Sequence, residues 1–92
     1  MKNIKLQKIR KKLDKLDDKF LSLIKKRTLL VNQVLLTKKL KKEIVDKRRI
    51  RKILSNIKIK SQKKNIDIKI TKEIWKTMIK AYINYEYRNF KK

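Results

Sequence analysis

The sequence predicts an all-α fold with one long helix and two shorter ones. Its 92 residues include neither glycine nor proline, the two residues that most often interrupt helices. Apolar residues recur at intervals of three and four between Leu6 and Val34, which is typical of a helix with one buried face. No part of the sequence has a convincing strand pattern. We expect residues 1–92 to form a single domain.

The first predicted helix runs from about residue 4 to about residue 40, and Arg27 occupies one of its apolar positions. Around Arg27 the helix becomes apolar on nearly every side, which indicates burial on every side. A helix of this length measures about 50 Å, and the remaining chain of about fifty residues is too short to cover it. We therefore predict a homodimer in which partner helices cover one another. The apolar stripe consists of Leu6, Ile9, Leu13, Leu16, Phe20, Leu23, Arg27, Leu30 and Val34.

Two aspartates predict where the shorter helices begin, because this side chain favours the N-cap position. Asp46 precedes a second helix that extends to about Lys63. Asp67 precedes a third helix, after the polar link SQKKN. The segment KKEIVD breaks the helical pattern between the first and second helices.

Composition excludes several classes of function. The chain has no cysteine or histidine, which removes disulfides, the usual zinc sites and the commonest general base. No apolar run is long enough to span a bilayer, and the N-terminus lacks the apolar core of a signal peptide, so we expect a cytoplasmic protein. The net charge of +23 suggests nucleic-acid binding, but the lysines are spread along the whole chain and do not cluster.

Arg27 and Lys38 are candidates for binding an anion. A buried guanidinium is costly unless it is paired, and its planar donors suit carboxylate or phosphate. Lys38 lies eleven residues later, three turns along the same predicted helical face, so both side chains can converge on a small dianion. The alternatives are an Arg27 that extends to solvent or pairs with an aspartate across the dimer, and a simply solvated Lys38.

Three segments together resemble the all-helical (AroQ-type) chorismate mutases over nearly the whole chain. The segments are LQKIRKKLDKLDDKFLSLIKKRTLLVNQVLLTKK, IVDKRRIRKIL and IDIKITKEIWKTMIKAYINYE. The resemblance implies an intertwined helical homodimer with two equivalent active sites. It also implies the unimolecular rearrangement of the dianion chorismate to prephenate in the biosynthesis of phenylalanine and tyrosine, without metal or cofactor.

The resemblance assigns roles to individual residues. Arg10, Arg27, Lys38 and Arg49 fall on the family's cationic positions. Arg27 corresponds to an arginine that clamps a substrate carboxylate, and Arg10 to one that reaches in from the other subunit. Lys38 would donate to the ether oxygen, where negative charge develops as the C–O bond breaks. Glu86 falls on a position that holds Gln or Glu and contacts the same oxygen.

Two positions depart from the mutase pattern. Ile50 replaces a glutamate that follows the arginine at position 49 in the family, and Tyr82 replaces a serine. These residues are reminiscent of the isochorismate pyruvate-lyase branch, which makes salicylate and pyruvate on the same fold. The alternatives are core packing for Ile50 and aromatic packing for Tyr82. We count Tyr82 and Asp46, which falls on the family's aspartate, among the substrate-binding residues.

The sequence therefore supports three hypotheses of different kinds. Chorismate mutase is the first and isochorismate pyruvate-lyase the second. The third, ranked last, is a non-catalytic basic helical protein that binds nucleic acid.

Overall fold

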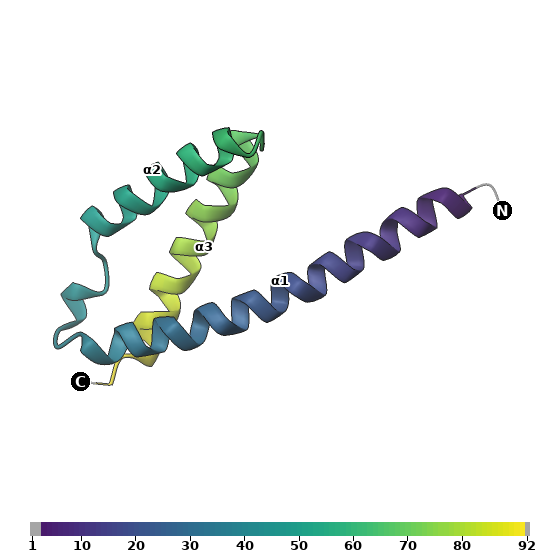
Figure 1. Ribbon diagram of the computed structural model, residues 1–92. Coiled ribbons are helices and arrows are strands. Elements are labelled where there is room, and N and C mark those ends of the chain that lie inside the picture. Colours follow the sequence, from purple (N-terminus) through teal and green to yellow (C-terminus); the bar gives the residue numbers. More distant parts are fainter. Residues whose placement is uncertain (1–2, 92) are drawn as a thin grey trace. The chain divides into compact units, whose positions relative to one another are not determined.

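The computed structural model describes residues 3–91, most of which are helical and none of which lies in a strand (Figure 1). The elements are α1 (Ile4–Thr37), the short 3-10 helix η1 (Lys41–Glu43), α2 (Lys47–Lys63) and α3 (Ile68–Asn89). This confirms the predicted all-α fold with one long helix and two shorter ones. None of the helices in the described range has an apolar stretch that could cross a membrane.

Helix α1 ends at Thr37, about three residues before the predicted end. The N–H of Lys38 donates to the carbonyl of Leu35 at 3.1 Å, which tightens the last turn. The next two N–H groups, those of Lys39 and Leu40, donate to the Glu43 side chain and therefore cannot continue the helix. The prediction missed this end because it followed the apolar pattern alone.

The chain forms two compact units, Met1–Gln33 and Val34–Lys92. Apart from Asn3, the described part of the first unit is a single stretch of α1. Its large apolar side chains are exposed along the whole stripe. They are Ile4, Leu6, Ile9, Leu13, Leu16, Phe20, Leu21, Leu23, Ile24, Leu29 and Leu30.

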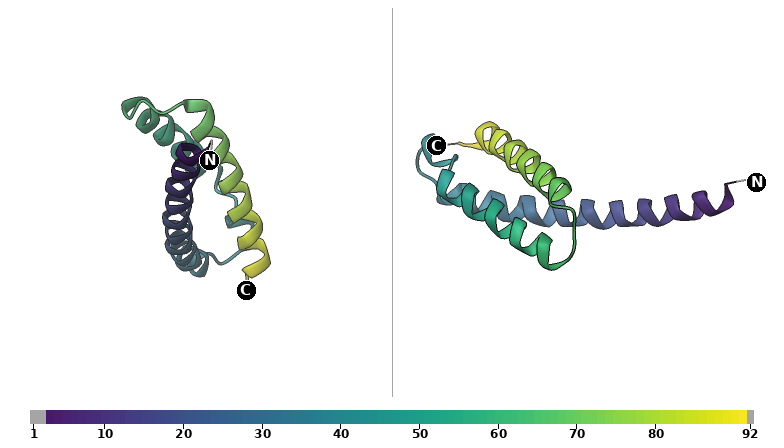
Figure 2. Two further views of the ribbon diagram at one scale, coloured as in Figure 1. Left: turned by 90° about the vertical axis from the view of Figure 1, so that its right-hand side faces the viewer. Right: turned by 90° about the horizontal axis from the view of Figure 1, so that it is seen from above.

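The second unit contains the packed helices α2 and α3, between which the chain reverses direction (Figures 1 and 2). The hydroxyls of Ser61 and Thr71 are buried and lie 2.8 Å apart, which joins the two helices next to their connection. The chain leaves α2 through Asn65, whose φ of 56° lies in the left-handed region. The N–H of Ile66 then donates to the carbonyl of Ser61, and that of Asn65 to Gln62. This pattern is a Schellman motif, in which asparagine takes the position that glycine usually fills.

Both predicted helix starts are confirmed. The Asp46 carboxylate accepts from the N–H of Arg49 at 3.0 Å, and the Asp67 carboxylate accepts from the N–H of Lys69 at 2.9 Å. The predicted polar link is shorter than expected, because Ser61 to Lys63 belong to α2.

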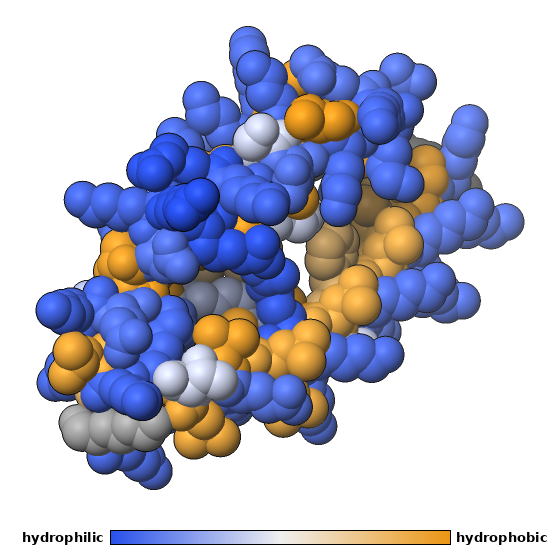
Figure 3. Space-filling view, turned by 60° about the vertical axis from the view of Figure 1, so that its left-hand side comes forward, coloured by the Kyte–Doolittle hydropathy of each residue, from blue (hydrophilic) through white to orange (hydrophobic). Residues whose placement is uncertain are grey.

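Few side chains are buried, and all of those in the described range lie in the second unit. They are Leu35, Ile44, Ser61, Thr71 and Glu86. The space-filling view shows apolar patches at the surface among long hydrophilic side chains (Figure 3). One of these five buried side chains, that of Glu86, carries a carboxyl group.

Candidate functional site

Lys38 and Glu86 form an ion pair inside the second unit. The Lys38 Nζ lies 3.9 Å from Oε1 of Glu86, and both side chains are mostly shielded from solvent, with 16% and 11% exposed. Lys38 directly follows α1, whereas Glu86 is near the end of α3. The fold therefore brings together two of the predicted site residues that are 48 positions apart in the sequence.

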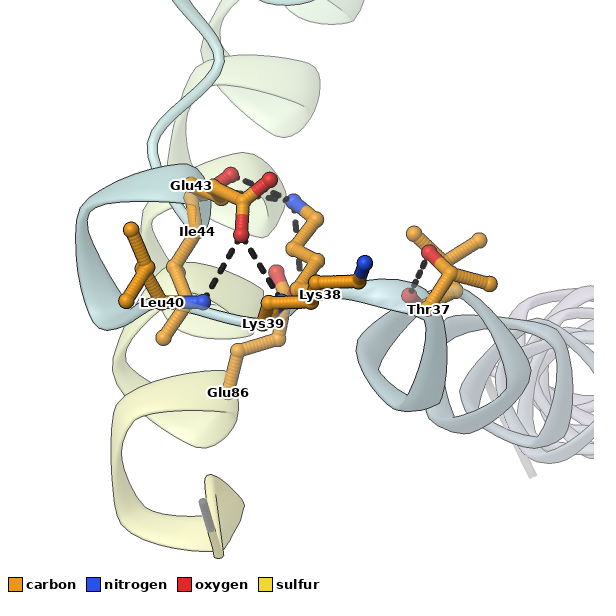
Figure 4. A network of polar contacts seen from close by, with 8 residues as sticks. Thr37, Lys38, Lys39, Leu40, Glu43, Ile44 and Glu86 are labelled. Carbon is orange, nitrogen blue, oxygen red and sulfur yellow. Dashed lines mark hydrogen bonds and ion pairs between the residues drawn. The ribbon is translucent and has the colours of Figure 1, made fainter.

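The Lys38 ammonium is held by the backbone of the segment that follows it (Figure 4). Its Nζ donates to the carbonyl of Glu43 at 2.8 Å and to that of Ile44 at 3.3 Å. An ammonium has three donors. The distance of 3.9 Å to Glu86 exceeds hydrogen-bonding range, so the third donor is not taken up by a hydrogen bond to that carboxylate.

Glu86 is the only buried acidic residue in the described part of the chain, with 8% of its surface exposed. Burial raises the pKa of the Glu86 carboxyl, and the positive charge of Lys38 opposes that rise without cancelling it. The protonated, hydrogen-bond-donating form of Glu86 therefore persists to a higher pH than it would in an exposed glutamate.

Glu43 has the opposite electrostatic environment. Its Oε1 accepts from the N–H groups of Leu40 at 2.7 Å and Lys39 at 2.8 Å. The bond from Leu40, followed by the bond from Lys39, lowers the pKa of Glu43. The ionised carboxylate thus stabilises the turn between α1 and α2.

Asp46 and Arg49 lie at the start of α2, and both are exposed. The carboxylate of Asp46 is used as the N-cap of that helix and accepts the N–H of Arg49. This contact fixes the backbone from which the Arg49 side chain extends, so Asp46 has a structural role beside the predicted substrate-binding one.

Tyr82 is half-buried on α3, four residues before Glu86 and therefore on the same helical face. Its ring meets that of Tyr85 edge to face, with centroids 6.3 Å apart. This contact is the aromatic packing that the sequence offered as the alternative to a ligand contact. Ile50 is half-buried on α2, in agreement with a packing role.

Arg10 and Arg27 belong to the first unit. Arg27 is half-buried and Arg10 is exposed. The two are 17 residues apart on one helix, or about 25 Å, which is too far for one small ligand to contact both. Arg10 and Arg27 of the same chain therefore cannot serve one site together.

Sequence reasoning missed the contribution of Glu43 and Ile44. A glutamate three residues after a helix N-cap is the signal of a capping box, but here the N-cap is Leu40 in place of the usual serine or threonine. Ile44 is the most deeply buried apolar residue of the described chain, with 3% exposed, although it follows a strongly polar run.

Comparison with known proteins identifies one family. The family model of chorismate mutase type II matches residues 9–87. The match spans all seven predicted site residues, from Arg10 to Glu86. No curated protein and no solved structure matches the chain.

Proposed function

The chain belongs to the chorismate mutase type II family, and on this premise we propose that it catalyses the rearrangement of chorismate to prephenate. The observation that carries the proposal is the shielded pair of Lys38 and Glu86 within the matched region. One member is a fixed cation and the other is a carboxyl group whose protonated form is favoured. The reaction needs two such donors at a single oxygen.

The chemistry fits a chain without cysteine or histidine. A pericyclic rearrangement needs no nucleophile and no base. It needs the substrate held in a compact conformation, which removes an entropic barrier, and donors aimed at the ether oxygen as that oxygen becomes negative. Two of the three N–H donors of the Lys38 ammonium bind backbone carbonyls, and the third supplies one donor to the ether oxygen.

Glu86 supplies the second donor in its protonated form. A carboxylate would repel the developing negative charge on the oxygen, whereas a carboxylic acid donates to it. Burial raises the pKa of Glu86 and so maintains the acid, although Lys38 acts against it. Activity should accordingly fall as the pH rises through the pKa of this carboxyl.

The remaining cations would bind the two substrate carboxylates. By the resemblance, Arg27 would clamp one carboxylate, and Arg49, in the first turn of α2, would bind substrate as well. Asp46 fixes that first turn, and Tyr82 lies one helical turn from Glu86. These assignments are those that the resemblance implies, and all four residues lie within the matched region.

A second copy of the chain completes the site in this proposal. The exposed apolar stripe of the first unit needs a cover, and a partner helix provides one. In an antiparallel pair, Arg10 of one chain reaches the site that contains Lys38 of the other. The 17-residue separation of Arg10 and Arg27 supports this sharing, because one helix cannot bring both to one ligand.

Two residues favour isochorismate pyruvate-lyase as a second candidate activity. Ile50 removes the carboxylate that would bind the ring hydroxyl of chorismate, and Tyr82 fills the place of a serine. Both activities use the same cationic clamp, so the substrate distinguishes them.

The decisive assay follows the ultraviolet absorbance of chorismate with the purified protein. We expect chorismate to be consumed and prephenate to form, and Lys38→Met to abolish that consumption. Salicylate fluorescence from isochorismate, without consumption of chorismate, would identify the protein as an isochorismate pyruvate-lyase and contradict the mutase activity. A protein that converts neither substrate would overturn the enzymatic proposal. A steeply salt-dependent shift of duplex DNA would then point to nucleic-acid binding.

A further inference from the structure

The turn between α1 and α2 is closed by one carboxylate oxygen. Oε1 of Glu43 accepts the N–H groups of both Lys39 and Leu40, at 2.8 and 2.7 Å (Figure 4). The N–H of Glu43 itself donates back to the carbonyl of Leu40 at 3.0 Å. Glu43 and Leu40 are thereby fixed to each other by two bonds in opposite directions, as in a capping box.

The same turn supplies the acceptors that hold Lys38. Its Nζ donates to the carbonyl oxygens of Glu43 and Ile44, so the ammonium is positioned by the backbone of the residue whose side chain closes the turn. Ile44 is buried and anchors the far end of the segment in the second unit. The position of the cation relative to Glu86 therefore depends on the geometry of residues 39–44.

Removal of the Glu43 carboxylate would disturb this geometry directly. The N–H groups of Lys39 and Leu40 would lose their acceptor. They would then bind water, or they would bind carbonyls of α1 and lengthen that helix. Either change would move the two carbonyls that hold Lys38. A displacement of about 1 Å at a catalytic group can cost about a hundredfold in rate.

We propose that Glu43 is a positioning residue, which holds the Lys38 ammonium at its place beside Glu86 by fixing the turn whose carbonyls bind it. The effect on turnover rests on the proposed chorismate mutase function, whereas the effect on Lys38 does not. Glu43 is exposed, and its side chain accepts hydrogen bonds from the backbone N–H groups of Lys39 and Leu40, so its influence on Lys38 passes through the backbone.

The kinetic test compares Glu43→Ala with Glu43→Gln in the full chain. Both N–H groups use one oxygen of Glu43, and the amide oxygen of glutamine can accept both. We expect Glu43→Ala to lower kcat by about tenfold to a hundredfold with little change in KM, because Lys38 acts on charge that develops only in the transition state. Glu43→Gln should restore kcat to within a few-fold of the unsubstituted protein.

Asp67→Ala is the matched control for a general loss of stability. It also removes a carboxylate that accepts a backbone N–H in the second unit, but at the start of α3 and away from Lys38. We expect its kcat to stay unchanged at temperatures where the protein is folded. An equal fall of kcat in Glu43→Ala and Asp67→Ala would overturn the proposal, as would a Glu43→Ala protein with full kcat.

A spectroscopic readout tests the positioning without any substrate. In ¹⁵N-labelled protein, the Lys38 Nζ should give a side-chain ammonium signal that exchanges slowly with water, because two of its donors are hydrogen-bonded. Lys38→Arg identifies the signal by removing it. The signal should disappear or shift in Glu43→Ala and remain in Glu43→Gln and Asp67→Ala.

The two measurements separate the positioning proposal from the function on which it builds. If the protein converts no chorismate and the Lys38 signal still depends on Glu43, the proposed function fails and the positioning role stands. A Lys38 signal that is the same in Glu43→Ala as in the unsubstituted protein would overturn the positioning role, whatever the activity.

Discussion

The two units of this chain differ in how their side chains are buried and hydrogen-bonded. In the second unit, Val34–Lys92, a small buried core is combined with hydrogen-bonded caps and the Lys38–Glu86 pair. In the described part of the first unit, no side chain is buried and the apolar stripe of α1 is exposed. Both units expose large apolar side chains, but only the second has buried side chains among the described residues.

This contrast explains why the proposed activity needs both units. In the proposal, the second unit would supply the donors for the reacting oxygen, Lys38 and Glu86. The first would supply Arg10 and Arg27, which the single helix places too far apart for one ligand. In the proposed dimer, the association that covers the apolar stripe is also the association that completes each site.

The largest expected effect comes from the second unit. Lys38→Met should lower kcat for chorismate by about a thousandfold, because it removes a fixed donor from a shielded site. The fold should persist, and circular dichroism, which reports mainly the helices, checks this. A variant that keeps more than a tenth of the original kcat would contradict the catalytic assignment of Lys38.

The next effect tests the first unit. Leu13→Asp places a charge in the apolar stripe, once in each chain of the proposed symmetric dimer. Because burying an unpaired charge is costly, the variant should dissociate and lose turnover at micromolar concentration. Sedimentation velocity measures the dissociation. Lys12→Asp, one residue earlier, is the matched control and should remain dimeric. A Leu13→Asp protein that stays dimeric would show that the stripe is not the interface.

A third prediction concerns the pH dependence of the pair in the second unit. If protonated Glu86 is the donor, kcat should be high at low pH and fall as the pH rises through the raised pKa of this carboxyl. Glu86→Gln donates at every pH and should remove that fall. An unchanged pH–rate profile in Glu86→Gln would contradict the assignment.

The smallest expected effect concerns the two N-caps of the second unit, Asp46 and Asp67. Asp46→Ala and Asp67→Ala each remove one N-cap and should each lower the free energy of unfolding by about 1 kcal/mol, measured by urea denaturation. Only Asp46→Ala should also raise KM, because it loosens the turn from which Arg49 extends. Equal KM values in the two variants would reduce Asp46 to a structural cap.

How far the sequence could predict these features depends on how local they are. The caps at Asp46 and Asp67 were predictable, since an N-cap is a contact between a side chain and a backbone N–H two or three residues later. The end of α1 was not, because it depends on Glu43 reaching back past an atypical N-cap, Leu40.

The candidate site was predictable only through the resemblance to a family. Periodicity placed Arg27 on the apolar stripe, but no local pattern links Lys38 to Glu86 across 48 residues. The carbonyls that hold Lys38 belong to backbone, and backbone acceptors leave no trace in residue identity. Tyr82 shows the same limit, because its packing against Tyr85 follows from helix geometry as much as from any ligand.

The most direct test of the shared site mixes two inactive variants, Arg10→Ala and Lys38→Met. Each homodimer lacks one essential cation in both sites. A mixed dimer has one site with both cations intact and one site with neither. After dissociation and reassociation, random pairing should recover about a quarter of the original chorismate turnover. Recovery of that size would support a site built from two chains, and no recovery from a mixture that has reassociated into dimers would contradict it.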